Sequence, residues 1–169
     1  MAKETFWADA HAEPKRAYRW TVYFGGLSEY IAKKVSKPSF TVTETAHTYL
    51  NHKFYYPGRV EWNTINLTVV DSVAPNASGE ILKMIEAAGY KTPVNSGQAK
   101  HTMSKAAAEA RLQEVKIHQL KPDGSVMETW TLKGCWIKDV KFGELDYESD
   151  DMIEIELELR YDFATLSGN

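Results

Sequence analysis

The clearest pattern in this chain is a run near its C-terminus in which apolar and charged residues alternate. From Ile153 to Phe163 every second residue is apolar, and the residues between them are charged. Because successive side chains of a strand point to opposite faces, this period of two predicts one long strand with a core-facing apolar side. The charged side suits either an ordinary solvated face or an acidic wall that faces something specific, and it carries Glu154, Glu156, Glu158, Arg160 and Asp162.

Shorter runs of strand-forming residues predict further strands. They cover residues 18–24, 30–36, 40–45, 60–71, 115–120 and 126–132. Gly25-Gly26 ends the first strand, and Lys121-Pro122-Asp123-Gly124 predicts a tight turn that joins the last two as a hairpin. Trp62 falls on the opposite parity from Ile65 and the alternate residues that follow it. This mismatch predicts a bulge or burial on both faces.

One segment between the strands has the period of a helix. Asn76 can cap a helix that continues to Ala88, and Gly89 can take the position just after its end. The expected buried stripe consists of Ile81, Leu82, Ile85 and Ala88. A shorter helix is predicted over residues 104–111. Strands on both sides of a helical segment indicate a single α+β domain of 169 residues, mainly β, built as an antiparallel two-sheet sandwich or barrel with a flanking helix.

Two segments do not fit this core. Residues 1–16 form an N-terminal arm whose Phe6 and Trp7 need cover, either from their own domain or from another subunit. Residues 46–59 lack a helical period and are too aromatic for a solvated loop, so we expect an extended hairpin or long loop. Its apolar side chains predict either a small core beneath the loop or a contact with a partner.

The charge of the chain is unevenly distributed. The whole chain carries a net charge of −3, whereas the segment from Asp139 to Asp162 has ten acids and two bases. We therefore expect one strongly acidic surface on an otherwise mildly basic protein, which is not basic enough for a dedicated nucleic-acid binder. The single cysteine, Cys135, excludes an internal disulfide and fits a reducing compartment. Neither a signal peptide nor a membrane-spanning run is predicted.

No catalytic, metal or cofactor site is predicted. The five histidines lack the spacing of metal ligands, and phosphate-binding glycine loops and nucleophile elbows are missing from the sequence. Cys135 has no basic cluster around it and is expected to be a buried thiol rather than a nucleophile. The C-terminal acids leave open a small hydrolase, and the aromatic content leaves open a monomeric β-barrel that binds an apolar ligand.

Three features together resemble a known family. The first is Leu-Lys-Gly-Cys-Trp at residues 132–136, followed by Gly-Glu-Leu-Asp-Tyr-Glu-Ser at 143–149 and a closing strand that ends in Tyr161-Asp162-Phe163. The second is the strand over residues 59–70 that follows a long loop, and the third is the order of the elements. In these respects the chain resembles the tail tube proteins of contractile-tailed bacteriophages.

The resemblance implies a structural virion protein rather than an enzyme. Members of the family form hexameric rings whose inner sheets join around a channel, and the rings stack into a tube inside a contractile sheath. The implied partners are other copies of the chain, the sheath, baseplate and tail-terminator proteins, and a tape-measure protein and DNA that pass through the channel without specific contacts. Synthesis in the host bacterial cytoplasm is also implied. Tubes of phage-derived injection devices and of type VI secretion systems look similar and remain an alternative.

The resemblance also implies roles for particular residues. The extended loop would contact the next ring or subunit through Tyr49, Leu50, His52, Phe54, Tyr55, Tyr56 and Arg59. Phe6 and Trp7 would cover a neighbouring copy, and residues 164–169 would form a C-terminal tail. The channel would be lined by Glu154, Glu156, Glu158 and Asp162, whose negative charge would repel phosphates. The same acids could instead lie at a subunit or sheath contact, and Arg160 interrupts their row.

Overall fold

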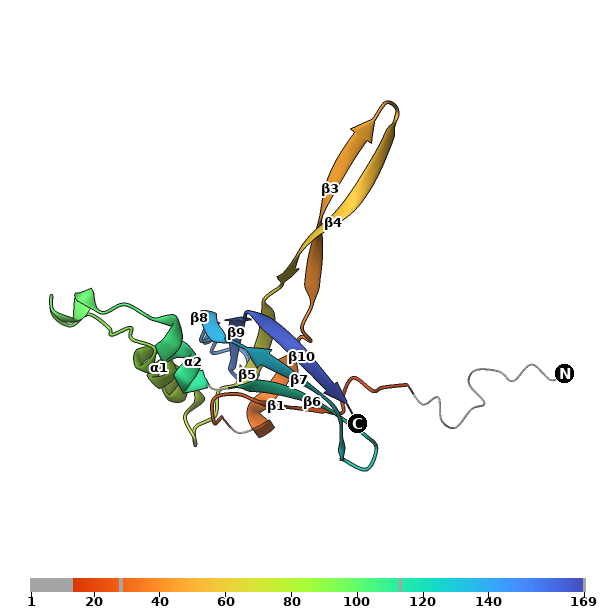
Figure 1. The fold of residues 1–169 in the computed structure, drawn as a ribbon. Helices are drawn as coiled ribbons and strands as arrows, with labels where there is room; N and C mark the ends of the chain where they lie inside the picture. The colour runs from red at the N-terminus through yellow and green to blue at the C-terminus, as the bar shows by residue number, and fades with distance from the viewer. Residues whose placement is uncertain (1–13, 28, 113, 169) are drawn as a thin grey trace.

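Two four-stranded antiparallel sheets pack together, and a long hairpin projects away from them (Figure 1). The computed structural model describes residues 14–27, 29–112 and 114–168. The first sheet has the order β1 (Trp20–Tyr23), β6 (Val115–Leu120), β7 (Val126–Lys133) and β10 (Phe163–Gly168). The second has the order β2 (Ala32–Val35), β5 (Ile65–Val70), β9 (Glu154–Arg160) and β8 (Trp136–Lys141). The hairpin consists of β3 (Phe40–Tyr49) and β4 (His52–Trp62).

The helices lie together at one side of the sheets (Figure 1). They are α1 (Ala77–Ala87) and α2 (Lys105–Leu112), and short 3-10 turns occupy Glu29–Ile31 and Gln98–Lys100. α2 packs against both α1 and β8. None of the helices in the described part of the chain has the length and apolar character that crossing a membrane requires.

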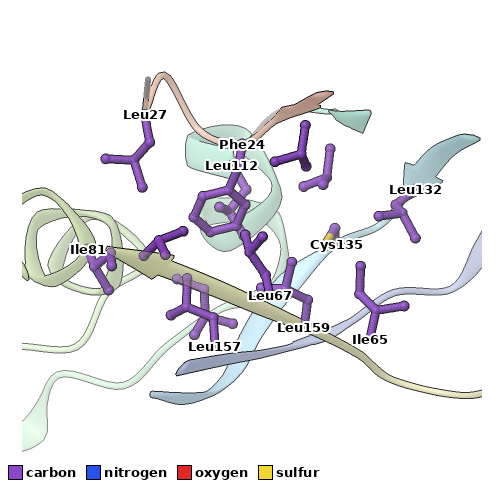
Figure 2. Packing of buried hydrophobic residues seen from close by; sticks show 14 of the residues in the cluster. Phe24, Leu27, Ile65, Leu67, Ile81, Leu112, Leu132, Cys135, Leu157 and Leu159 are labelled. Atoms are coloured by element: carbon purple, nitrogen blue, oxygen red, sulfur yellow. The ribbon is translucent and has the colours of Figure 1, made fainter. Parts of the chain in front are cut away.

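The core forms where the alternating strands turn their apolar sides inward. In the second sheet Leu67 of β5 lies opposite Leu157 of β9, and both are buried. Leu132 of β7 faces them from the first sheet, and Ile81 of α1 and Leu112 of α2 close the side of the cluster (Figure 2). The period of two therefore predicts these core positions correctly, because each strand has one buried face.

The expected single strand from Ile153 to Phe163 is wrong. β9 ends at Arg160, and β10 begins at Phe163 in the other sheet. The buried Tyr161 lies at the corner between them. Apolar and charged residues continue to alternate through this corner, so periodicity does not reveal the change of sheet. The predicted C-terminal tail is corrected as well, because β10 extends to Gly168 and pairs with β7.

The expected strand over residues 60–71 is divided in the structure. Trp62 ends β4, two residues follow, and β5 begins at Ile65. The backbone N–H of Asn63 donates to the carbonyl of Ser39 at 2.9 Å and closes the base of the hairpin. The parity of Trp62 differs from that of Ile65 because the two residues belong to different strands, so the mismatch reflects neither a bulge nor burial on both faces.

The predicted helix over residues 76–88 is confirmed, with one error in its buried stripe. The Asn76 side chain accepts a hydrogen bond from the backbone N–H of Gly79 at 3.0 Å and caps α1. Ile81 and Ala88 are buried as expected, whereas Leu82 is exposed and Met84 is buried in its place. The buried stripe follows the helical repeat through positions 81, 84, 85 and 88. Position 82 is rotated by about 100° around the helix from position 81, which turns its side chain towards solvent.

Burial of Cys135 generates a prediction about thiol chemistry. The side chain is fully buried, and this burial raises the pKa of the thiol to about 12. We expect the native protein at pH 8 to be inert to a disulfide reagent such as DTNB and to react promptly after denaturation.

The same pKa shift predicts a dependence of stability on pH. Because the folded pKa lies above the ordinary value of a cysteine thiol, the free energy of unfolding should decrease as the pH rises from about 9 towards 12. Urea unfolding at pH 8 and pH 10.5 measures this decrease, which should be smaller in Cys135→Ala. An equal decrease in the variant would assign it to other groups.

Candidate functional site

The hairpin carries eight of the large hydrophobic side chains that are exposed in the described residues. All residues of β3 and β4 are exposed except Trp62, which is half-buried. The contact residues predicted from the sequence are all exposed, and the exposed fractions of their aromatic and aliphatic side chains range from 51% for Phe54 to 81% for Leu50. The segment therefore does not cover a small core, which was one of the two predicted alternatives. The hairpin is also longer than the predicted loop over residues 46–59, since it begins at Phe40 and includes the separately predicted strand over residues 40–45.

The strand register gives the hairpin two different faces. Directly opposed residues share a face, and the register pairs His47 with Phe54, Thr45 with Tyr56 and Tyr49 with His52. One face is thus dominated by aromatic and histidine side chains. The other face near the tip carries Lys53 and Tyr55. Leu50 occupies the turn with a φ of 52°, a left-handed conformation that tight hairpin turns require.

Aromatic contacts fix the base of the hairpin to the sheets. The ring of Phe40 meets that of Trp62 edge-on with centroids 5.2 Å apart, and Trp62 lies 5.9 Å from the ring of Tyr161. Further along, a bulge opposes Thr43 to Gly58 and Arg59. A Cβ at Gly58 would lie 2.4 Å from the Thr43 hydroxyl, so only glycine fits there. The position of the hairpin is therefore set by packing at its base.

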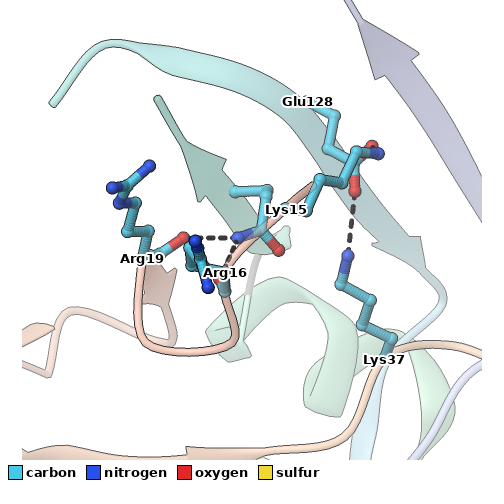
Figure 3. Close-up of polar contacts among 6 residues, drawn as sticks. Lys15, Arg16, Arg19, Lys37 and Glu128 are labelled. Atoms are coloured by element: carbon cyan, nitrogen blue, oxygen red, sulfur yellow. Dashed lines mark hydrogen bonds and ion pairs between the residues drawn. The ribbon is translucent and has the colours of Figure 1, made fainter. Parts of the chain in front are cut away.

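A second anchor lies where the chain enters the first sheet. The nearly buried carboxylate of Glu128 forms ion pairs with Lys15 and, at 2.9 Å, with Lys37 (Figure 3). Beside it, the amide of Gln119 donates to the carbonyls of Arg16 at 2.9 Å and Arg19 at 2.7 Å. Hydrogen bonds from Lys15 and then Lys37 hold the pKa of the Glu128 carboxyl below its usual value. Together these groups tie residues 15–19 and the segment before β3 to one sheet.

Sequence reasoning missed Glu128 and Gln119. They lie opposite each other in the register of β6 and β7, at buried positions of strands that otherwise carry apolar residues inward. The signal that would have identified them is a polar residue, in each strand, at a position where the alternation points the side chain into the core. The predicted arm residues Phe6 and Trp7 lie outside the described residues.

The predicted acidic row is only partly brought together. Glu154, Glu156 and Glu158 share the outward face of β9, and each has a lysine beside it. Lys33 pairs with Glu154, Lys141 lies 3.5 Å from Glu156, and Lys138 lies 2.8 Å from Glu158. The hydrogen bond from Lys138 is the main cause that lowers the pKa of Glu158. This face therefore has mixed charge, and the expected strongly acidic surface does not form here.

Asp162 lies apart from that row. It occupies the corner between β9 and β10, where its carboxylate pairs with Lys105 of α2. A Cβ at Gly134 would lie 2.3 Å from the Asp162 carboxylate, so the glycine allows this close approach. Asp162 therefore helps to attach α2 to the corner of the sheets.

The outward face of the second sheet is hollowed and polar. A hollow of about 430 Å³ crosses β2, β5, β9 and β8, and its lining includes Lys34, Ser36, Asn66, Asp139, Lys141 and Glu156. Acids and bases both line this hollow, so it favours neither a cation nor an anion. Within the described residues no group of three or more histidine, cysteine or carboxylate side chains is placed to hold a metal ion.

The borders of both sheets are open. Within the described residues β2 and β8 each have one neighbouring strand in the second sheet, and β1 and β10 each have one in the first. An edge strand presents unpaired N–H and C=O groups that can pair with another chain. The fold therefore offers sheet borders as well as the hairpin for contacts between molecules.

Comparisons with known proteins identify the fold. No protein-family model matches the sequence, and no curated protein matches it either. Solved structures do match. A chain of the sheath/tube terminator of the extracellular contractile injection system PVC in the extended state has a TM-score of 0.68 and 16% identity, covering 92% of this chain and 98% of that chain.

Two further structures give similar values. A chain of the PVC sheath-tube complex in the extended state has a TM-score of 0.65 and 17% identity over 92% of this chain and 93% of that chain. A chain of the tube-terminating cap of the anti-feeding prophage has a TM-score of 0.66 and 18% identity over 93% of both chains. The protein thus shares the fold of these chains from contractile injection system assemblies, and the predicted fold class is confirmed.

The Glu128 anchor generates a prediction about acid stability. Because the pKa of this carboxyl is lowered in the folded state, its stabilising effect should be present above about pH 4.5 and lost as the pH falls further. Glu128→Gln should reduce the free energy of unfolding at pH 7 by about 1 to 3 kcal/mol, and the difference from wild type should shrink near pH 3. Urea unfolding at both pH values measures this.

The exposed Glu86 of α1 provides the matched control for that measurement. Glu86→Gln should change the free energy of unfolding by less than about 0.5 kcal/mol at either pH. Equal effects of the two substitutions would show that Glu128 does not anchor the segments it contacts.

Proposed function

We propose that this protein is the building block of a tube. Copies associate side by side into hexameric rings, and the rings stack into the inner tube of a contractile phage tail that conducts the genome into the host. The observation that carries the proposal is the combination of a tube-type fold with open sheet borders and an exposed aromatic hairpin. Each of these features leaves part of the protein surface for a second copy to cover.

The strand order of the second sheet supports the contact within a ring. Its four strands are antiparallel throughout, so the border strands β2 and β8 run in opposite directions. A neighbour related by rotation would bring its β2 beside β8 in antiparallel orientation, and the sheet would continue from copy to copy. Closing the ring in this way removes every open border of that sheet.

The outward face of the second sheet would then line the channel. We place Glu154, Glu156 and Glu158 in this lining and leave Asp162 out, because it pairs with Lys105 at the corner. The lysines beside the three glutamates make this lining mixed in charge. Transiting DNA or a tape-measure protein would meet few clusters of charges of a single sign, so it should pass through the channel without strong binding.

The hairpin would provide the contact between rings through Tyr49, Leu50, His52, Phe54, Tyr55, Tyr56 and Arg59. Phe6 and Trp7 of the arm would cover a neighbouring copy. Sheath, baseplate and terminator proteins are the further partners, because the matching chains come from assemblies described as sheath-tube, baseplate, terminator and cap structures. Such a role is structural and needs no catalytic residue.

A second candidate is the tube protein of a phage-derived injection device. The comparisons favour it, since the matching assemblies are an extracellular contractile injection system and an anti-feeding prophage. The two functions differ in cargo rather than in the protein itself. Capsid genes beside the gene for this protein would assign it to a virion, and a sheath gene without capsid genes would assign it to an injection device.

Self-assembly is the first test of the proposal. Purified protein at high concentration should form six-fold rings or tubes in negative-stain electron microscopy, because in a pure sample only other copies are present to cover the sheet borders and the hairpin. Monomers alone at high concentration would contradict both candidate functions.

The aromatic triad of the hairpin gives a sharper test. Replacing Phe54, Tyr55 and Tyr56 by serine should abolish tubes while rings persist, because these exposed side chains would act between rings. The free energy of unfolding should change by less than about 0.5 kcal/mol for each exposed position. Electron microscopy and urea unfolding measure the two effects.

Serine at the exposed Leu82 and Tyr90, which lie away from the hairpin, is the matched control and should leave tubes intact. Tubes of normal length from the triad variant would contradict the role of the hairpin.

A further inference from the structure

The loop between β8 and β9 combines negative charge with exposed apolar side chains. We call residues 142–153 the acidic loop. Its acids are Glu144, Asp146, Glu148, Asp150 and Asp151, and it contains no lysine or arginine. Leu145 and Tyr147 are fully exposed or nearly so, and Met152 is 67% exposed. Apolar side chains presented among charges are typical of a surface that another protein covers.

The acidic loop is held in a defined shape. The Asp146 carboxylate accepts from the backbone N–H of Glu148 at 3.0 Å, and the backbone N–H of Asp71 donates to the carbonyl of Ile153 at 2.9 Å. Gly143 has a φ of 86°, and a Cβ there would lie 2.7 Å from the Glu154 carbonyl. Because the loop already has a fixed backbone, binding should require little further ordering of it.

The hairpin is complementary to this loop in charge and in chemistry. Between Thr45 and Val60 it contains Lys53, Arg59 and two histidines but no acid. Its aromatic face carries the exposed Phe54 and Tyr56. Glu44 and Glu61 lie nearer the base of the hairpin, so its positive charge is confined to residues 45–60. This basic, aromatic outer part and an acidic loop with exposed apolar side chains can therefore cover each other.

The two surfaces lie at opposite ends of the same sheet. The hairpin joins β5 at Ile65, which pairs with Leu159, whereas the acidic loop joins β9 at Glu154, which pairs with Val70. These ends are about 17 Å apart along β9. The hairpin also projects away from the sheets (Figure 1), so it does not fold back onto the loop of its own chain. Stacking copies head to tail brings the hairpin end of one copy to the loop end of the next.

We propose that the acidic loop is the receptor for the hairpin of the copy in the next ring. Phe54 and Tyr56 of the aromatic face pack against Leu145 and Tyr147, and the positive charges of Arg59 and, on the opposite face of the tip, Lys53 attract its carboxylates. This inference rests on the proposed tube function and names the partner surface within it. It also makes the stack of rings polar. Each copy presents its hairpin to the ring on one side and its acidic loop to the ring on the other side.

Charge reversal on each side tests the pairing. The hairpin variant is Lys53→Glu with Arg59→Glu, and the loop variant is Glu144→Lys with Glu148→Lys. The combined variant carries all four changes, so every contact between rings regains opposite charges. Asp146 is left unchanged because it holds the loop. The matched control, Glu29→Lys with Glu86→Lys, reverses two exposed acids outside the loop.

Each variant is examined for rings and tubes by electron microscopy and for the fraction of protein that sediments as tubes. The hairpin and loop variants should each lower that fraction at least tenfold while rings persist. The combined variant should recover at least half of the wild-type fraction, and the control should match wild type. Tube formation by wild type should also decrease as salt screens the exposed charges. Circular dichroism and thermal unfolding confirm that each variant is folded.

The outcomes separate this inference from the proposed function. Wild-type tubes that persist in both single-side variants would overturn the pairing and leave the tube function standing. Loss of tubes in both variants without recovery in the combined variant would also overturn it, because each surface would then meet something else. Wild type that forms neither rings nor tubes would overturn the tube function and the pairing together.

Discussion

The packing of Tyr161 at the corner between β9 and β10 determines how the parts of this protein fit together. Its side chain is buried where the chain passes from one sheet to the other, and its ring contacts Trp62 at the base of the hairpin. One aromatic residue therefore joins both sheets and the projecting strands. Burial also raises the pKa of its hydroxyl, so the group stays neutral in the core at any ordinary pH.

Much of this architecture follows from local patterns. The inward residues of β5 and β9, the capped helix α1 and the turn at residues 121–124 are all predicted, because each depends on residues close together in sequence. For the aromatic segment the sequence leaves two outcomes open, a small core beneath it or an exposed hairpin that meets a partner. Both faces of the hairpin are solvent-accessible, so its sequence has no buried side to impose a period of two. Its register and length follow from pairing across the turn at Leu50.

Charge was predicted least well, for a physical reason. The acids of β9 lie close together in sequence, but the lysines beside them come from other strands, and Lys33 lies 121 positions from Glu154. Counting charges along the chain therefore exaggerates the acidity of a folded face. The ion pairs of Glu128 were not predicted for the same reason, because its partners Lys15 and Lys37 lie far from it in sequence. In contrast, the acidic loop keeps its charge because its acids lie in one exposed segment without bases.

The Glu128 carboxylate has a mechanical consequence. Lys15 lies at the end of the N-terminal arm and Lys37 precedes the hairpin, and both side chains pair with this single carboxylate. A pull on either segment is thus borne by the same attachment to β7, and the load on one is shared with the other. Such a common tether would keep residues 15–19 and the segment that leads into the hairpin from shifting independently of each other.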